Sequence, residues 1–155
     1  MIRGVRLAHV NLIARDWRSL ARFYQGVFGY EPVPPERDLH GADFDAGTGL
    51  SSARARGIHL RLPTDSSDGP TLEIFEYSEV FPRPSPQVNS LGYGHFAFSV
   101  ASVPDALANV LASGGTAVGQ IVTIAISVET TVTWCYVRDP EGNIVELQSR
   151  SSIRS

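Results

Sequence analysis

Hydrophobic and polar positions along the chain alternate with two different periods, and the change from one period to the other happens twice. Residues 5–13 form a β-rich run, after which apolar residues recur at helical spacing from Trp17 to Phe28. Asp16 is a suitable N-cap for this helix, and Gly29 suits the left-handed position that follows it. The pattern therefore predicts a strand followed by a helix.

The same order begins again near residue 93. Residues 93–100 are β-rich, Ser102 can cap a helix, and Gly114 and Gly115 end it. Further strands are expected at 57–62, 70–77, 130–137 and 143–148, with another inside 115–128 and a short one at 30–33. Residues 34–56 are of mixed polarity, and we expect a loop with room for one short helix, long enough to act as a lid.

Two histidines and two glutamates occupy matching positions in the two halves. His9 and His95 each stand 20 residues before the glycine that ends the following helix. Glu73 and Glu146 each stand four residues after a turn glycine. In the stretch at about 80–89, prolines at every second position indicate a linker between the halves. We therefore expect a single domain, 1–155, built of two modules at about 1–79 and 90–150 with a linker at about 80–89.

Each of these four residues is expected on a β-strand among apolar or neutral neighbours. A glutamate in such a place is costly to bury without a partner. Two carboxylates and two imidazoles facing one cavity would be stabilised by one divalent metal ion, and they suit zinc, nickel, cobalt, manganese or iron. His59 and Arg61 share another strand face, which could line a pocket or be a solvated face, and His40 is expected to be exposed.

Composition narrows the function classes. The net charge is −3 with no basic stripe, so nucleic-acid binding lacks its electrostatic footprint. No stretch is long and apolar enough for a membrane span, and no signal peptide is expected. Cys135 is the only cysteine, which excludes an internal disulfide and suits a reducing cytoplasm. The expected partner is a small-molecule substrate.

Three motifs together cover nearly the whole chain. They are Ala8-His9-Val10 with Phe23-Tyr24 and Phe28-Gly29, then Gly92-Tyr93-Gly94-His95-Phe96-Ala97-Phe98, and finally Arg138-Asp139-Pro140-Glu141-Gly142-Asn143-Ile144-Val145-Glu146-Leu147. On these motifs the sequence resembles the vicinal oxygen chelate superfamily, which includes glyoxalase I, methylmalonyl-CoA epimerase, bleomycin resistance proteins and extradiol dioxygenases.

The resemblance implies an α+β fold of two tandem βαβββ modules that form a cupped, barrel-like mixed sheet with flanking helices. Members of this size usually form homodimers, with metal ligands from one chain or from two. The four matched residues are the ligand set that metal-dependent glyoxalase I shows. Two departures, Ile13 in place of a glutathione-binding Arg and Tyr77 in place of an Asn, argue against glutathione hemithioacetal as the substrate.

The function that the resemblance implies is a metal-dependent lyase or isomerase of the glyoxalase or epimerase type. The metal would bind a substrate carbonyl, and Glu146 or Glu73, with Glu146 favoured, would remove a proton from the neighbouring carbon to give an enediolate. The expected substrate contacts are Asn11, Tyr77, Ser99, Gln148 and Arg61. Two alternatives stay open: an antibiotic-type binding protein without catalysis, and an extradiol-type dioxygenase. The presence of all four ligand residues disfavours the first, and a fourth ligand at Glu73 disfavours the second.

Overall fold

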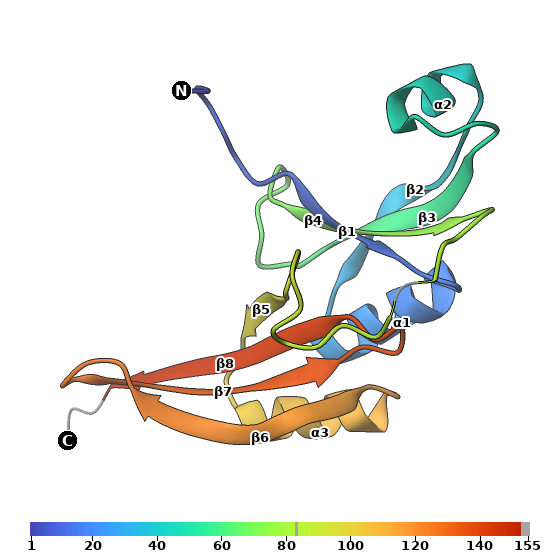
Figure 1. Cartoon of the computed structure of the whole chain (residues 1–155). Helices are drawn as coiled ribbons and strands as arrows, with labels where there is room; N and C mark the ends of the chain where they lie inside the picture. The colour runs from blue at the N-terminus through green and yellow to red at the C-terminus, as the bar shows by residue number, and fades with distance from the viewer. Residues whose placement is uncertain (83, 153–155) are drawn as a thin grey trace. The chain divides into compact units, whose positions relative to one another are not determined.

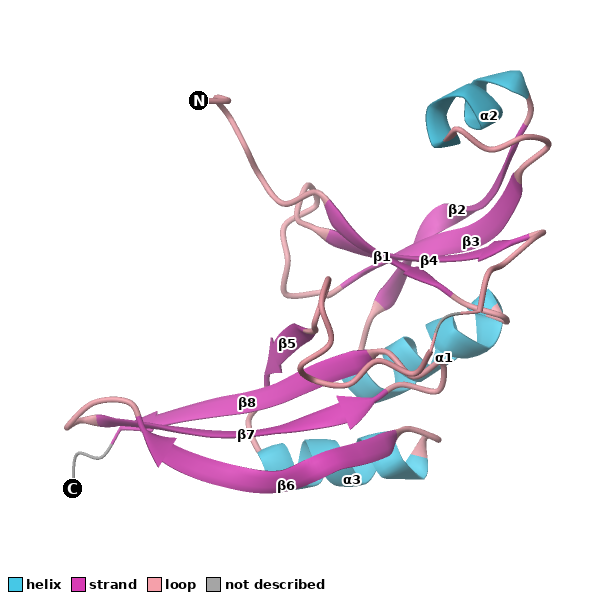
Figure 2. Ribbon diagram, viewed as in Figure 1, coloured by secondary structure: helices cyan, strands magenta, loops and turns pink. Residues whose placement is uncertain are grey.

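The computed structural model describes residues 1–82 and 84–152, and the chain divides into two compact units, Met1–Pro82 and Arg83–Ser155. Figure 1 follows the chain by colour, and Figure 2 separates its helices from its strands. Each unit has its own four-stranded mixed sheet and at least one helix. The α+β fold of two tandem modules that the sequence predicts is therefore confirmed.

The first unit contains four strands and two helices among its described residues. Its elements are β1 (His9–Ile13), α1 (Trp17–Phe28), β2 (Glu31–His40), α2 (Ala42–Thr48), β3 (Arg54–Arg61) and β4 (Thr71–Tyr77). The strands lie in the order β1-β4-β3-β2, with β1 parallel to β4 and the other neighbours antiparallel. Helix α1 packs on β3 and β4, whereas α2 lies beside β2 (Figure 1).

The second unit repeats this order without a counterpart of α2 in its described part. Its elements are β5 (Phe96–Ser99), α3 (Val103–Ala112), β6 (Thr116–Ala125), β7 (Thr130–Arg138) and β8 (Ile144–Ser152). The strand order is β5-β8-β7-β6, again with one parallel pair, β5 with β8. Helix α3 runs along this sheet and contacts β6, β7 and β8 (Figure 2).

The residues predicted to cap the helices do so. The side chain of Asp16 accepts a hydrogen bond from the backbone N–H of Ser19 at 3.0 Å, and Ser102 accepts one from Asp105 at 3.3 Å. Gly29 adopts the left-handed conformation at a φ of 72°. These caps fix where each helix starts and where α1 ends.

One face of each sheet forms the apolar core. Alternation along the strands gives that face its most deeply buried residues, which are Leu12, Ile58, Leu60, Leu72 and Ile74 in the first unit and Cys135, Val137, Val145 and Leu147 in the second. The side chains between them in sequence point to the opposite face. Both predicted His–Glu pairs have their glutamate on that opposite face.

The prediction for residues 34–56 is right about one short helix, which is α2, and wrong about the loop. Strand β2 begins at Glu31 and continues to His40, and α2 and the start of β3 occupy most of what remains. The prolines of β2 argue against a strand in the sequence, because proline has no N–H to donate to a neighbouring strand. The β2–β3 register shifts between Val33 and Arg37, and Pro34 and Pro35 lie inside this irregularity. A candidate lid in this segment is therefore replaced by regular structure.

The connection from α2 to β3 is held by one carboxylate. Asp45 accepts hydrogen bonds from the backbone N–H groups of Ser52 at 2.8 Å and Ala53 at 2.9 Å.

A second correction concerns His95, which lies one residue before β5 and not on a strand.

Across residues 1–82 and 84–152, no helix combines the length and the apolar character that crossing a membrane would need.

Candidate functional site

Strand register brings two predicted residues of the first unit to Glu73. The parallel pairing of β1 with β4 places Asn11 opposite Glu73, and His9 stands two residues earlier on the same face of β1. The antiparallel pairing of β3 with β4 places His59 opposite Glu73 from the other side. Glu73 is therefore flanked by a strand on each side, and each of these strands carries a histidine.

The distances show that Glu73 is held closely. Its Oε1 lies 3.3 Å from His9 Nδ1 and 3.2 Å from His59 Nε2, and its Oε2 accepts a hydrogen bond from Asn11 Nδ2 at 3.4 Å. The Glu73 side chain is only 11% exposed. A carboxylate this deeply buried needs such partners, because burying an unpaired charge is costly. We refer to His9, Asn11, His59 and Glu73 as the N-terminal cluster.

Of the two interpretations of the strand face that carries His59, the solvated face is wrong for this residue. The side chain of His59 is 23% exposed and faces Glu73. Burial lowers the pKa of His59, the charge of Glu73 opposes this, and Arg37 on β2 lowers the pKa further. Alternation within β3 places His59 on a face, but only the pairing of β3 with β4 shows which residue it meets.

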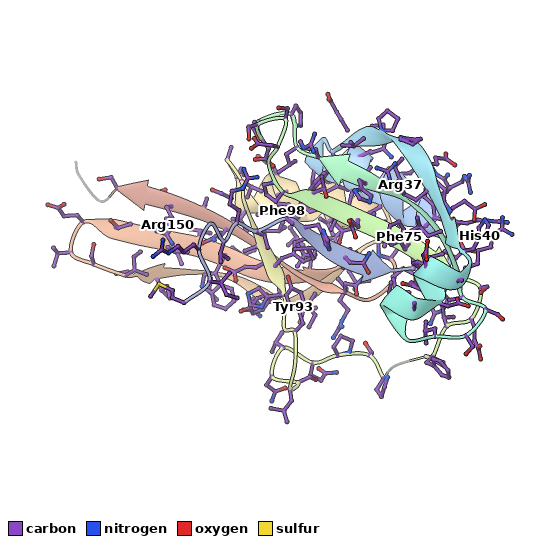
Figure 3. The ribbon with its side chains drawn as sticks, turned by 90° about the horizontal axis from the view of Figure 1, so that it is seen from above. Arg37, His40, Phe75, Tyr93, Phe98 and Arg150 are labelled. Carbon is purple, nitrogen blue, oxygen red and sulfur yellow. The ribbon has the colours of Figure 1, made fainter. Side chains whose placement is uncertain are left out.

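An aromatic ring supports the N-terminal cluster. Phe75, two residues after Glu73, lies with its ring centroid 5.9 Å from that of His59, at an interplanar angle of 62°. Gly57 makes room for this ring, because a Cβ built at Gly57 would lie 2.1 Å from Phe75 Cδ1. Figure 3 labels Phe75 on β4, with Arg37 and His40 on β2. Sheet pairing and ring packing therefore both restrict where His59 can lie.

The second unit contains the other predicted pair. His95 Nε2 lies 2.9 Å from Glu146 Oε2, and the Glu146 side chain is 18% exposed. Tyr136 stands opposite Glu146 on β7, and its ring centroid is 4.9 Å from that of His95. Burial, together with the charge of Glu146, raises the pKa of Tyr136. Trp134 continues this aromatic row, with its ring centroid 5.0 Å from that of Tyr136.

The two units match in register but differ in chemistry. Ala97 stands opposite Glu146, and His95 precedes Ala97 by two residues, as His9 precedes Asn11. Ala97 offers no amide to the carboxylate. Within residues 1–82 and 84–152, the structure records one polar side-chain contact for Glu146, that with His95. We refer to His95, Tyr136 and Glu146 as the C-terminal cluster.

The five expected substrate contacts are distributed unevenly. Asn11 contacts Glu73, as described. Ser99 and Gln148 stand opposite each other on β5 and β8, two residues beyond the register position of Glu146. Tyr77 stacks on Phe44 of α2, with ring centroids 6.1 Å apart, four residues beyond Glu73. The recorded ring contact of Tyr77 is therefore with helix α2 and not with the N-terminal cluster.

Arg61 lies on the same face of β3 as His59 and lines a cavity at the end of this strand. This cavity, of about 470 Å³, is also lined by Glu31, Leu62, Asp65 and Ser67 among other residues. The Nε atom of Arg61 is buried and has no hydrogen-bond partner in the described part of the chain. The expectation that Arg61 could line a pocket thus fits this cavity at the end of β3.

The donor atoms of each pair suit a divalent metal, since imidazole nitrogen and carboxylate oxygen are common ligands of zinc and its neighbours. Each pair places one donor of each kind within 3.3 Å of the other. Among the residues described, no group of three or more His, Cys, Asp or Glu side chains is gathered as a metal would require. Each pair taken alone therefore offers two donor groups, whereas a zinc site uses three or four protein ligands.

A comparison with family models identifies the fold from sequence. Residues 6–147 match the model of the Glyoxalase/Bleomycin resistance protein/Dioxygenase superfamily. This match spans both units and all four predicted metal ligands. A search of curated proteins found no match.

Solved structures agree with this result. A glyoxalase family protein from Bacillus cereus is 18% identical, with a TM-score of 0.80, 97% of this chain covered and 99% of the other. A glyoxalase family protein from Enterococcus faecalis is 22% identical, with a TM-score of 0.61 and coverages of 95% and 99%. A glyoxalase/bleomycin resistance protein/dioxygenase family enzyme from Burkholderia phytofirmans is 17% identical, with a TM-score of 0.57 and coverages of 94% and 98%. At these identities the likeness concerns the fold alone.

Proposed function

The chain belongs to the glyoxalase/bleomycin resistance protein/dioxygenase superfamily, and from this premise we propose that it is a metal-dependent lyase or isomerase. The reaction would move a proton at a carbon next to a carbonyl group of a small substrate. The observation that carries this proposal is the duplicated His–carboxylate contact, His9 with Glu73 and His95 with Glu146.

These four side chains would hold one divalent ion, whether the two pairs come from one chain or from two copies in a homodimer. When bound, the ion would supply Lewis-acid polarisation of the substrate carbonyl. His9 and His95 would act as fixed ligands. Asn11, Ser99 and Gln148, which stand within two register positions of Glu73 or Glu146, are the side chains that we propose for orienting the substrate.

Glu146 is the better candidate for the base. A base must accept a proton from carbon and return it, so its carboxylate needs freedom to move. Glu73 is held by His9, His59 and Asn11, whereas the recorded polar side-chain partner of Glu146 is His95. We therefore assign proton transfer to Glu146 and a holding role to Glu73.

The test starts with the metal content of protein purified without chelator. The purified protein is then screened against methylglyoxal with several thiols and against acyl-CoA epimers. Glu146→Gln should lower kcat by about 10²–10⁴-fold, and Glu73→Gln should act mainly by weakening metal binding. Glu79→Gln, at an exposed position, is the matched control.

Three results would argue against the proposal. Full metal-dependent turnover in both Glu73→Gln and Glu146→Gln would mean that neither carboxylate is the base. Oxygen uptake with catechols would favour a dioxygenase. Ligand binding by protein that holds no metal and turns over none of the substrates would favour a binding protein. Light scattering on the purified chain tests the expected homodimer.

A further inference from the structure

The two units place different residues at one equivalent position. The residue opposite Glu73 on the antiparallel neighbour strand is His59, and the residue opposite Glu146 is Tyr136. His59 Nε2 lies 3.2 Å from Glu73 Oε1. For Tyr136 the structure records ring contacts with His95 and Trp134 but no hydrogen bond to Glu146 in the described residues. Among the described residues, only the first unit thus has an imidazole nitrogen of this neighbour strand within 3.2 Å of its carboxylate.

We propose that His59 is a positioning residue, whose Nε2–H donates to Glu73 Oε1 and keeps this carboxylate oriented as a metal ligand. The inference rests on the proposed function, since it assigns a role within the same site. A group hydrogen-bonded to a ligand fixes the orientation of that ligand, and losing it commonly weakens metal affinity.

The surroundings of His59 suit a holding role. Its backbone is fixed by the β3–β4 ladder, and its ring packs on Phe75, which in turn occupies the space left by Gly57. Because the side chain of His59 is only 23% exposed, most of the water that could compete for its contact with Glu73 is kept away. The contact itself is of the positioning kind, because His59 Nε2 lies 3.2 Å from a carboxylate oxygen of Glu73.

Cobalt(II) titration of the protein, followed by absorption, measures the affinity that this inference concerns. His59→Leu should weaken Co²⁺ binding by about 10–100-fold. His59→Gln, whose amide can still donate, should recover most of the loss. His40→Leu is the matched control, because His40 is an exposed histidine at the end of β2 (Figure 3). Equal melting temperatures of the metal-free variants would exclude unfolding as the cause.

A double-mutant cycle tests whether His59 acts through Glu73. In a Glu73→Gln background, His59→Leu should cost little further affinity, since the carboxylate that it orients is gone. Additive losses would overturn the inference, as would wild-type affinity in His59→Leu. A cobalt spectrum that loses a nitrogen ligand in both His59→Leu and His59→Gln would also overturn it and would make His59 a ligand.

A metal-free readout separates this inference from the proposed function. Long-range ¹H–¹⁵N NMR of the metal-free protein should show a protonated Nε2 on His59, with a shift that changes in Glu73→Gln but not in Glu146→Gln. If this signature is present and the wild-type protein binds no metal, the proposed function fails while the contact stands. If the wild-type protein binds metal and the signature is absent, the inference alone fails.

Discussion

Replacing Gly57 by alanine should destabilise the protein strongly, although it adds a single methyl group. The new Cβ would lie 2.0 Å from the backbone oxygen of Ile74 and 2.1 Å from Phe75 Cδ1, whereas real Cβ atoms essentially never come closer than 3.0 Å. Strand β4 would have to move by about 1 Å, and the ring of Phe75 would have to leave its place. Overpacking of this kind costs about 1–3 kcal/mol.

Displacement of Phe75 adds to that cost. Phe75 is 7% exposed, and burying such a side chain contributes about 1.5–3 kcal/mol, of which a partial loss is about 1 kcal/mol. The expected total is about 3 kcal/mol. For a chain of this length each kcal/mol lowers the melting temperature by about 2–4 °C, so Gly57→Ala should melt about 6–12 °C below the wild-type protein.

Circular dichroism during heating and in urea measures this loss. The matched control is Gly26→Ala in helix α1, where a Cβ meets nothing within 4 Å. That change should stabilise the protein by about 0.5–1 kcal/mol, because alanine favours the helix over glycine. A Gly57→Ala protein as stable as the wild type would refute the close approach of β3 and Phe75, and with it the packing argument for His59.

Three further predictions concern single groups. Hydrogen bonding to Arg54 lowers the pKa of Asp38 to about 2. The stabilisation of the folded chain by this Asp38–Arg54 pair is therefore present above about pH 4 and is lost as the pH falls toward 2. In an NMR titration, Arg54→Gln should move the pKa of Asp38 upward. Burial, with the nearby charge of Asp65, raises the pKa of Tyr30 to about 12 from 10.0. Stability should therefore fall as the pH rises from 10 toward 12, and Tyr30→Phe should reduce this fall in alkaline melting curves. Asp139, 3% exposed, accepts at least three hydrogen bonds in the turn before β8; Asp139→Ala should cost about 1–3 kcal/mol in urea unfolding, and an unchanged midpoint would contradict this.

Local patterns along the chain predict α1 and α3 and the residues that cap their N-termini. Asp16 and Ser102 cap the helices, and Gly29 ends α1, because capping depends on residues within one turn of each other. The repeat of His9 and Glu73 as His95 and Glu146 likewise predicts contacts that the structure contains in each unit. The repeat predicts these contacts because each unit has one parallel strand pair of the same register, in which the glutamate stands opposite the second residue after the histidine.

Those patterns do not predict the register between neighbouring strands. His59 faces Glu73 only because β3 pairs with β4 at that offset. The same limit applies to β2, whose prolines are typical of a loop. Pro34 and Pro35 are tolerated there because the β2–β3 register shifts around them.

The duplication offers a physical reason for two carboxylates with unequal roles. The two units share strand order and register, so the backbone places Glu73 and Glu146 in equivalent surroundings. Differences between them must then come from the side chains opposite, which are Asn11 and His59 in one unit and Ala97 and Tyr136 in the other. Donors on both flanks restrict a carboxylate to one orientation, which suits a metal ligand. A methyl group and an aromatic ring leave the carboxylate freer to move, which suits a base that must take up a proton and return it.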